Sequence, residues 1–346
     1  MSRPVKPVTG RKNAEHRGAR DAECLTLAHS HCGREKMPGP SFDIQGHRGA
    51  RGVSPENTLP GFARALEIGV STLEFDCAIT ADGIVVVSHD AVLNPDITRL
   101  DGRWIAQRGP AINTLSYAAL SRYDVGAIRP DSAYARRFPM QQPLDDVHIP
   151  RLADVFALTV ATRAEHVRFN IETKIDPTQP QLSVGPEPFV HAIMAEVIAA
   201  GMKARTTIQS FDWRTLAIVQ REFSGVATAC LTTQRVGDDN VLPTRDRASP
   251  WTNGLHFYDY RSVPKMVHAA GGNIWSPRFQ DLDSATIADA RTLGLAVIPW
   301  TVNEREDMAR LIDWGVNGLI SDYPHRLREV LEAKKMPLPP QVRAPA

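Results

Sequence analysis

The strongest constraint on the fold is an alternation of strand-like and helix-like segments that extends over most of the chain. Short runs rich in β-branched and other apolar residues are separated by longer segments in which apolar residues recur at helical spacing. The strand-like runs lie at residues 43–46, 72–77, 167–172, 205–210, 226–231, 273–276, 295–301 and 317–321. Eight strands that alternate with helices are typical of a closed parallel barrel, so we predict an α/β fold of this kind.

Helices are expected between these strands and after the last one. The later helical segments lie at residues 152–162, 188–200, 212–222, 262–270, 284–293, 304–314 and 324–334. The first helix is expected to begin near Ser54, with Ser54 as its N-cap and Pro55 in its first turn, and to end at Gly69. Each predicted strand is therefore followed by one helix.

The composition limits the classes of partner. The chain has 346 residues and a formal net charge of +1, so it carries no overall field that would attract nucleic acid or an anionic membrane. Four cysteines are too few for a disulfide scaffold, and no apolar run reaches the about 18 residues that a membrane-spanning helix needs. We therefore expect a small-molecule substrate that is bound by local groups, no nucleic acid partner and no transmembrane segment. The oligomeric state is left open.

The first two strand-like runs carry a group of reactive side chains. Glu74 and Asp76 alternate on the second run, and His47 ends the first. A tight-turn signal followed by a run of valines predicts a β-hairpin that returns His89 to the neighbourhood of the two acids. Because active sites of parallel barrels lie at the carboxyl ends of the strands, we expect these four side chains to converge there.

The acidic residues form a candidate metal site. Carboxylates at positions i and i+2 of a strand share a face, so Glu74 and Asp76 can reach one cation, and Glu172 on the adjacent strand adds a third oxygen ligand. A pair of acids on a strand is usually exposed to solvent, whereas unpaired acids are costly on a buried barrel strand. An all-carboxylate set favours a hard divalent ion, so we predict a site for Ca²⁺ or Mg²⁺.

Two histidines and two basic residues complete the candidate chemistry. One of His47 and His89 can take a proton from an attacking hydroxyl while the other protonates the leaving oxygen. Arg48 and Lys174 supply positive charge for a phosphate group. A metal site with two proton-transfer groups and a basic anion contact predicts cleavage of a phosphodiester.

Two further residues at strand ends are assigned to substrate contacts. Gln209 lies on the fourth predicted strand, and Trp300 lies at the end of the seventh. The ring of Trp300 is equally compatible with stacking against a small polyol and with a place in the barrel core.

The two ends of the chain are expected to lie outside the folded domain, which we place at residues 41–334. Residues 1–40 are basic and polar and lack the apolar region of a signal peptide, so we predict a disordered tail and a cytoplasmic location. A signal peptide hidden by the chosen start codon would instead imply a periplasmic or secreted protein. Residues 335–346 are rich in proline and are expected to be loose.

One long segment interrupts the alternation. Residues 91–150 are rich in Pro, Arg and Asp and show little periodicity. We interpret the region from about 80 to 150 as an inserted small subdomain with one short helix near 116–122. Loops of this length are often functional, so we expect the insertion to lie beside the mouth of the active site and to influence substrate choice.

Seven segments of the chain resemble the glycerophosphodiester phosphodiesterase family, in the order that the family has them. They are GHRGARGVSPENTLPGFARALEIGV, LEFDCAITADGIVVVSHD, IPRLADVFAL, FNIETK, TIQSFDWRTL, PWTVNEREDM and GVNGLISDYP, and they extend from about residue 43 to 330. HRG with PENT, E-x-D with HD, and NIExK are specific as a combination, although each motif alone would be weak.

The resemblance implies a triosephosphate-isomerase-type (β/α)8 barrel and metal-dependent hydrolysis of glycerophosphodiesters to sn-glycerol 3-phosphate and an alcohol. It implies these roles by position: an acid/base pair (His47, His89), metal ligands (Glu74, Asp76, Glu172) and phosphate contacts (Arg48, Lys174). Either a hydroxyl of the glycerol, through a cyclic phosphate, or water itself can be the attacking group.

Two other functions compete with this prediction. A lysophospholipase D-like enzyme would need an apolar groove at the barrel mouth, for which the insertion offers Trp104, Tyr123, Tyr134 and Phe138. A non-catalytic barrel that binds a phosphorylated ligand would be indicated by the loss of a histidine or a ligand acid. All of these residues are present, which disfavours the non-catalytic alternative.

Overall fold

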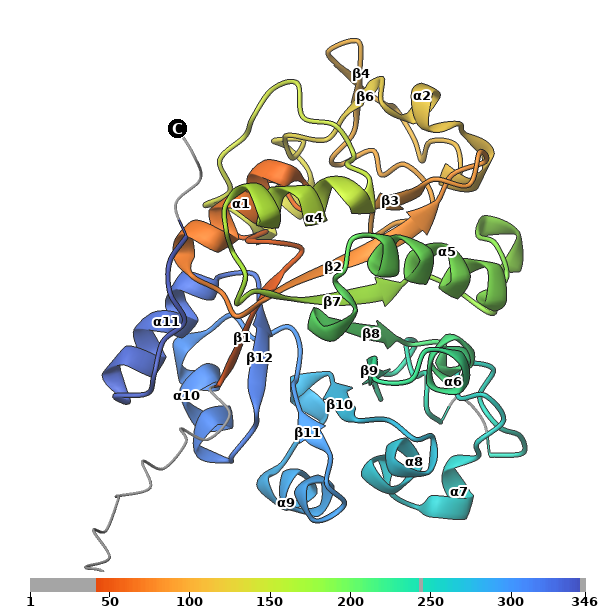
Figure 1. The fold of residues 1–346 in the computed structure, drawn as a ribbon, viewed down its shortest axis with the longest axis vertical. Helices are drawn as coiled ribbons and strands as arrows, with labels where there is room; N and C mark the ends of the chain where they lie inside the picture. The colour runs from red at the N-terminus through yellow and green to blue at the C-terminus, as the bar shows by residue number, and fades with distance from the viewer. Residues whose placement is uncertain (1–41, 243–244, 343–346) are drawn as a thin grey trace, which may run out of the picture. The chain divides into compact units, whose positions relative to one another are not determined.

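The computed structural model describes residues 42–242 and 245–342, and these form the predicted parallel barrel (Figure 1). Its strands are β1 (Asp43–His47), β2 (Thr72–Ile79), β7 (Arg168–Thr173), β8 (Thr206–Ser210), β9 (Ala227–Thr232), β10 (Ile274–Pro277), β11 (Ala296–Val297) and β12 (Gly318–Ser321). From β1 to β11 each strand pairs with the next in chain order, and β12 pairs with the free edge of β1. The predicted eight-stranded fold is therefore confirmed. The predicted N-terminal tail lies outside the described residues.

Backbone hydrogen bonds join the segments at the two ends of this strand order. The amide of Ile320 donates to the carbonyl oxygen of Pro299 over 3.0 Å, and the amide of Val302 donates to the carbonyl oxygen of Ile320 over 2.9 Å. The chain also stays beside β10 after β11 ends, because the amide of Trp300 donates to the carbonyl oxygen of Pro277 over 3.0 Å. The barrel is therefore nearly closed, and its last strand lies next to its first.

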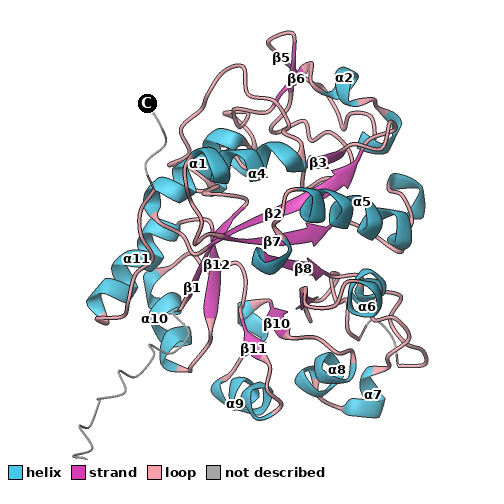
Figure 2. Ribbon diagram, in the orientation of Figure 1, coloured by secondary structure: helices cyan, strands magenta, loops and turns pink. Residues whose placement is uncertain are grey.

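Helices surround the strands on the outside of the barrel (Figure 2). They are α1 (Leu59–Ile68), α4 (Leu152–Ala161), α5 (Pro186–Ala199), α6 (Trp213–Glu222), α7 (Phe257–Tyr260), α8 (Val263–Ala269), α9 (Ser284–Thr292), α10 (Arg305–Asp313) and α11 (Pro324–Ala333). The seven later helices predicted from periodicity agree with α4, α5, α6, α8, α9, α10 and α11 to within two residues at each end.

The predicted start of the first helix is wrong. Thr58, and not Ser54, is the N-cap of α1, and its side chain accepts a hydrogen bond from the amide of Gly61. The residue before it, Asn57, has a φ of +54°, which a continuous helix from Pro55 could not contain. Asn57 is held in this conformation by the turn that follows β1, because its amide donates to the carbonyl oxygen of Arg48 over 3.0 Å.

Aromatic side chains fill the layer between the barrel and the outer helices. Phe169 on β7 packs edge to face with Phe75 on β2 and with Phe156 on α4, and the ring centroids are 6.5 and 4.9 Å apart. All three rings are buried. Edge-to-face packing adds to the free energy gained by burial, so Phe169 is a central member of this core.

The insertion after β2 forms a small subdomain with a core of its own. Its elements are β3 (Val85–Val87), β4 (Arg99–Leu100), β5 (Arg103–Trp104), α2 (Tyr117–Leu120), β6 (Tyr123–Asp124) and α3 (Ala133–Arg137). β3 pairs antiparallel with β2, as the predicted hairpin requires, and β5, β4 and β6 form a separate sheet. The predicted short helix is confirmed as α2, whereas α3 and the small sheet were missed because such short elements carry no measurable periodicity.

The Pro-rich segment that follows α11 has no regular secondary structure, but its described part is not loose. The amide of Val342 donates to the carbonyl oxygen of Leu66 over 3.0 Å, and Nη1 of Arg328 donates to the carbonyl oxygen of Pro339 over 2.8 Å. This segment therefore packs against α1 and α11. In the described part of the chain, no helix combines the length and the apolar character that crossing a membrane would need.

Replacing Phe169 with alanine should lower the free energy of unfolding by about 3–5 kcal/mol, because the substitution leaves a cavity between β2, β7 and α4. The measurement is urea-induced unfolding followed by circular dichroism. Val160→Ala is the matched control, since Val160 is also on α4 but is 63% exposed, and it should change stability by no more than about 0.5 kcal/mol. Equal stabilities of the two variants would contradict this account of the core.

Candidate active site

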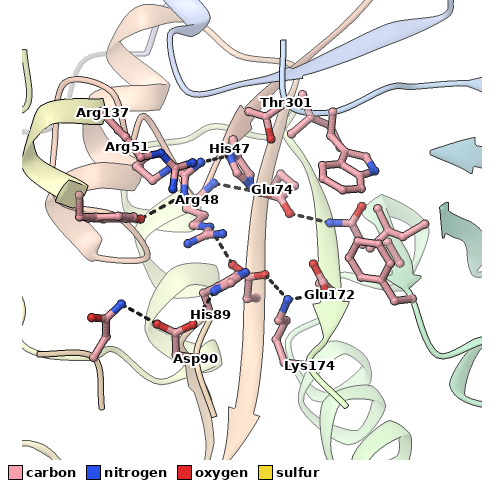
Figure 3. A pocket seen from close by; sticks show the side chains of 18 residues that line it. His47, Arg48, Arg51, Glu74, His89, Asp90, Arg137, Glu172, Lys174 and Thr301 are labelled. Atoms are coloured by element: carbon pink, nitrogen blue, oxygen red, sulfur yellow. Dashed lines mark hydrogen bonds and ion pairs between the residues drawn. The ribbon is translucent and has the colours of Figure 1, made fainter. Parts of the chain in front are cut away.

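A cavity of about 320 Å³ opens at the carboxyl ends of the barrel strands, and all nine residues singled out from the sequence line it. The side chains come from the ends of β1, β2, β7 and β8 and from the segments that follow β3 and β11 (Figure 3). The predicted convergence is therefore found in the structure. The roles assigned to these residues stay predictions.

The turn after β1 has a backbone that requires glycine. Gly49 has a φ of +90°, and a Cβ on Gly46 would lie 2.2 Å from the carbonyl oxygen of Gly49. This tight turn directs the amide of Arg48 toward β2, where it donates to Oε2 of Glu74 over 3.0 Å. The GHRG sequence therefore places His47 and Arg48 directly beside the acidic residues.

The register between β2 and β7 brings three acids together. Asp76 lies opposite Glu172, and Glu74 lies one step earlier on the same face of β2. One carboxylate oxygen from each of the three side chains lies within 4.8 Å of the others, and all three side chains are buried. Oxygen ligands at this spacing suit a hard divalent cation.

Burial and mutual repulsion raise the pKa values of two of these acids. Burial and the charge of Asp76 raise the pKa of Glu74 well above its usual value. Burial also raises the pKa of Glu172 to about 7, although Lys174 opposes the shift. A bound divalent cation would favour the ionised form of each carboxylate and relieve the repulsion. The residues present therefore fit a metal ion.

Two cations offset part of the negative charge. Nζ of Lys174 lies 2.8 Å from Oε1 of Glu172, and Nε of Arg48 lies 3.4 Å from Oδ2 of Asp76. Burial would raise the pKa of Asp76, but these cations and His89 outweigh burial and hold the pKa well below its usual range. Nε of Arg48 is buried and makes no hydrogen bond within the described residues, so the ion pair with Asp76 is its polar contact there.

His47 is oriented by an aspartate from the other end of the chain. Its Nδ1 lies 2.6 Å from Oδ1 of Asp322, the residue that follows β12. Asp322 also accepts hydrogen bonds from Nε of Arg51 over 2.7 Å and from Nδ2 of Asn303 over 2.7 Å. A carboxylate on Nδ1 favours the tautomer with its hydrogen there, which leaves Nε2 free, 4.0 Å from Oε2 of Glu74. Burial and Arg51 lower the pKa of His47 to about 4, although Asp322 opposes the shift.

His89 has a similar arrangement nearer to solvent. Its Nδ1 lies 2.9 Å from Oδ1 of Asp90, and its side chain is 33% exposed. Nδ2 of Asn94 donates to Oδ2 of Asp90 over 2.8 Å and holds that carboxylate in place. Burial lowers the pKa of His89, with Arg48 as the next cause, while Asp90 and Asp76 act in the opposite direction.

Gln209 is engaged with the acids more closely than the sequence suggested. Its Nε2 donates to Oε1 of Glu74 over 2.6 Å, and its Oε1 accepts from Nδ2 of Asn170 over 2.9 Å. Nδ2 of Asn170 also donates to Oε1 of Gln45 over 2.8 Å, so the orientation of each amide in the barrel interior is determined. Gln209 lines the cavity, but these contacts make it a positioning residue for Glu74.

Aromatic side chains form one wall of the cavity. The ring of Trp300 packs edge to face with that of Phe211, with centroids 5.4 Å apart, and both line the cavity. Of the four insertion aromatics named above, Tyr134 lines the cavity. Trp104 packs against Arg99 and Arg129, Tyr123 packs on the core of the insertion, and Phe138 packs on Arg51. They do not combine into an apolar groove.

Asp322 and Arg51 are the main site residues that the sequence analysis missed. Asp322 follows the last barrel strand at the same end of the barrel as the other site residues, and that position was a usable signal. Arg51 lies four residues after His47 and could have been linked to it in the same way. Tyr134 was named only as a possible part of an apolar groove, and the structure places it on a five-residue helix of the insertion, where it lines the cavity.

Comparisons of the sequence with known proteins find a matching family and several relatives. A family model described as the glycerophosphoryl diester phosphodiesterase family matches residues 47–326. A glycerophosphodiester phosphodiesterase of Bacillus subtilis (strain 168) is 25% identical over 286 residues, which cover 82% of this chain and 84% of that protein. The lysophospholipase D GDPD1 of Homo sapiens is 25% identical over 294 residues, which cover 82% of this chain and 84% of that protein.

Solved structures show the same fold. A protein of Silicibacter pomeroyi DSS-3, assigned as a glycerophosphoryl diester phosphodiesterase, superimposes with a TM-score of 0.76 at 36% identity, covering 87% of this chain and 96% of that one. A phosphodiesterase of Oleispira antarctica, solved in complex with the product sn-glycerol-3-phosphate, gives a TM-score of 0.61 at 18% identity, covering 84% of this chain and 97% of that one. The second likeness shows the fold alone.

Asp322→Asn should destabilise the protein by about 3–5 kcal/mol at pH 7, because it removes the buried partner of Arg51 and His47. Burial would raise the pKa of Asp322, but Arg51 and His47 outweigh burial and hold the pKa well below its usual value. The stabilisation that ionised Asp322 provides is therefore present above about pH 4 and is lost as the pH falls toward the folded-state pKa. The measurement is urea unfolding from pH 7 down to pH 3.

The difference between wild type and Asp322→Asn should shrink toward the acid end of this series. Asp313→Asn is the control, since Asp313 is 67% exposed in its contact with Lys334, and it should differ from wild type by at most about 1 kcal/mol at every pH. A difference for Asp322→Asn that does not change with pH would contradict the assigned charge state.

Proposed function

The chain belongs to the glycerophosphoryl diester phosphodiesterase family, and we propose that it uses a divalent cation and two histidines to hydrolyse glycerophosphodiesters to sn-glycerol 3-phosphate and an alcohol. One observation carries the proposal. Three buried acids that can hold one cation lie in the same cavity as two histidines whose Nδ1 atoms are each held by an aspartate. Binding of a phosphorylated ligand would not by itself require this pair of oriented histidines.

Glu74, Asp76 and Glu172 hold the cation. When bound, a Ca²⁺ or Mg²⁺ ion would stabilise negative charge on the phosphoryl oxygens and lower the pKa of a nearby hydroxyl. Gln209 keeps Glu74 in position through its 2.6 Å hydrogen bond, and Asn57 does the same for Asp76 through a 3.0 Å hydrogen bond to Oδ2. Both ligand acids therefore have fixed orientations before a cation arrives.

Arg48 and Lys174 orient the phosphodiester. Arg48 lies beside Asp76, with Nε 3.4 Å from Oδ2 of that residue, and its guanidinium contacts one phosphoryl oxygen. Lys174 lies on the opposite side of Asp76, with Nζ 3.8 Å from Oδ1 of that residue, and it contacts a second oxygen as a compact charge. The phosphorus is thereby held over the three acids.

The two histidines move the protons. His47 takes the proton from the attacking hydroxyl, because its buried Nε2 lies beside Glu74 and its low pKa keeps it unprotonated at neutral pH. The attacking oxygen then forms a bond to phosphorus, and the bond from phosphorus to the alcohol oxygen breaks. His89, whose protonated form is favoured by Asp76 and Asp90 against the effect of burial, protonates that alcohol oxygen as it leaves. The same roles serve attack by water and attack by a hydroxyl of the glycerol.

The glycerol portion of the substrate lies against Trp300 and Phe211. These rings offer apolar faces to the carbon atoms of a small polyol, and the indole hydrogen is not free, since Nε1 of Trp300 donates to the carbonyl oxygen of Ser276 over 2.9 Å. Trp300 therefore contributes a surface for stacking more than a hydrogen-bond donor.

Lysophospholipids are an alternative class of substrate, because a human protein similar to this chain is named a lysophospholipase D. Their hydrolysis requires an apolar path for the acyl chain at the cavity mouth. The aromatic residues of the insertion pack on arginines and on the core of the insertion instead of forming such a path. This arrangement supports water-soluble diesters as the substrates, and a comparison of glycerophosphocholine with lysophosphatidylcholine tests the choice.

Removal of the metal should abolish activity. We expect the purified protein to release choline from glycerophosphocholine, to lose this activity in excess EDTA, and to regain it with Ca²⁺ or Mg²⁺. Asp76→Asn and Glu172→Gln should weaken cation binding at least roughly tenfold, because each removes one of three charged ligands. Binding is measured directly by calorimetric titration of the metal-free protein.

Glu187→Gln is the matched control for these ligand variants. Glu187 belongs to a second group of acidic side chains, together with His191 and Glu222, but that group is exposed to solvent. This variant should bind the cation with unchanged affinity. Undiminished choline release in EDTA would contradict the metal role.

Loss of either histidine should lower kcat for glycerophosphocholine by about 10²–10⁴-fold, which is the usual contribution of a general acid or base. His47→Ala and His89→Ala should differ on glycerol 3-(p-nitrophenyl phosphate), because p-nitrophenolate leaves without a proton. We expect His89→Ala to recover most of its activity on this substrate and His47→Ala to recover none.

His148→Ala controls for unspecific effects of removing a histidine. His148 lies in the insertion, and its side chain is 41% exposed, so this variant should keep full activity on both substrates. Recovery of His47→Ala instead of His89→Ala would reverse the two assignments. Full activity of either active-site variant on glycerophosphocholine would refute them.

A further inference from the structure

Four positively charged residues line the active-site cavity, and one of them differs from the rest. Arg48, Arg51 and Lys174 are each in contact with a buried carboxylate, at distances of 2.7–2.8 Å. Arg137 lines the same cavity, but its side chain forms no ion pair or hydrogen bond in the described parts of the chain. Its charge is therefore available to a ligand.

Aromatic rings hold the guanidinium of Arg137 without neutralising it. Its central carbon lies 5.6 Å from the ring centroid of Tyr134 and 5.4 Å from that of Phe138. The residue is the last of α3 and is exposed to solvent. Cation–π contacts of this kind restrict an arginine but leave its N–H donors free.

The helix that carries Arg137 is anchored to the floor of the active site. The hydroxyl of Tyr134 donates to Oε2 of Glu56 and accepts a hydrogen bond from Nη1 of Arg51 over 3.1 Å. The guanidinium carbon of Arg51 also lies 4.5 Å from the ring centroid of Phe138. Because Glu56 in turn contacts Arg48, the position of Arg137 is coupled to the proposed phosphate site.

On the other side of the active site, every positively charged side chain of the described residues that line the adjoining space is paired with an acid, Lys174 with Glu172 among them. Beyond Lys174 and Phe211 an adjoining cavity of about 710 Å³ is lined by three aspartates (Asp176, Asp238, Asp239). Its two arginines have acidic partners, since Arg235 lies 3.5 Å from Asp238 and Arg278 lies 3.2 Å from Asp281. A negatively charged group on the substrate would therefore be attracted toward Arg137 more than toward this cavity.

We propose that Arg137 binds an anionic group on the alcohol portion of the substrate, so that the enzyme favours glycerophosphodiesters whose alcohol carries a second phosphate or a carboxylate. The inference rests on the proposed function. The glycerol portion then lies toward Trp300 and Phe211, the scissile phosphate lies between Arg48 and Lys174, and the alcohol extends toward α3.

The experiment compares substrates that differ in the charge of the alcohol. Glycerophosphoinositol and glycerophosphoinositol 4-phosphate differ by one phosphate, and glycerophosphocholine has a cationic alcohol. We expect Arg137→Ala to lower kcat/KM about fivefold for the inositol phosphate substrate, through KM, because an exposed ion pair contributes at most about this much. The values for the other two substrates should change less than twofold.

Two further variants of Arg137, one that reverses its charge and one that keeps it, test whether the charge is responsible. Arg137→Glu should lower kcat/KM for the inositol phosphate substrate further and raise it for glycerophosphocholine, whereas Arg137→Lys should keep most of the preference. Added salt should weaken the preference of the wild type and leave Arg137→Ala unaffected. Arg136→Ala is the matched control, since Arg136 lies on the same helix, is exposed and does not line the cavity.

Three results would overturn the inference. An equal loss on all three substrates in Arg137→Ala would assign Arg137 to the scissile phosphate. A loss in Arg136→Ala of the same size would make the effect one of general surface charge. A charge preference that responds to Arg108→Ala, and not to Arg137→Ala, would place the alcohol in a neighbouring cavity of about 220 Å³ that Arg108 lines.

The outcome is separable from that of the proposed function. EDTA-sensitive hydrolysis of glycerophosphocholine by the wild type supports the proposed function whatever Arg137 does. If the wild type hydrolyses all three diesters and the Arg137 variants show no charge-dependent change, the inference alone fails. If the wild type hydrolyses none of them, the proposed function fails, and the inference fails with it.

Discussion

The close approach of three buried carboxylates is the constraint on which the rest of this structure depends. Glu74, Asp76 and Glu172 meet because β2 and β7 are neighbours in register. Burial of three like charges is unfavourable unless other groups compensate for it. Arg48 and Lys174 supply part of that compensation, and the donor set suits a divalent cation for the remainder. In the proposed function the same cations bind the phosphodiester, so the groups that stabilise the site would also recognise the substrate.

Closure of the barrel orients one of the two histidines of the site. His47 ends the first strand and Asp322 follows the last, and the two are in contact because β12 pairs with β1. Arg51 and Asn303 hold Asp322 in turn. The orientation of the imidazole therefore depends on the fold as a whole. A parallel barrel brings the carboxyl ends of all its strands to one opening, which is why contacts of this kind can form between residues that are far apart in the chain.

The insertion contacts charged residues that follow β1. Tyr134 connects it to Glu56 and Arg51, which lie in the segment that follows β1. This contact places Arg137 at the rim of the cavity, opposite an adjoining space that is lined by aspartates. The barrel thus provides the groups for phosphodiester chemistry, while the insertion adds a charge that distinguishes one side of the cavity from the other.

Much of this could be predicted from local patterns, because buried strands, helical periodicity and reactive residues at strand ends are all visible in a single sequence. The alternation of elements determined the barrel, and the GHRG, E-x-D and NIExK motifs determined the family and the residue types of the site. Other features could not be predicted. A two-residue strand and a five-residue helix are too short to show a periodic pattern of apolar residues, and the side chains that contact each other are often far apart in the sequence. Only the tertiary structure decided that Gln209 holds Glu74, that Asp322 orients His47 and that Arg137 lies at the cavity without an acidic partner among the described residues. Those relations depend on strand register, barrel closure and the path of an irregular insertion, and each of these is set by packing between segments that are distant in the chain.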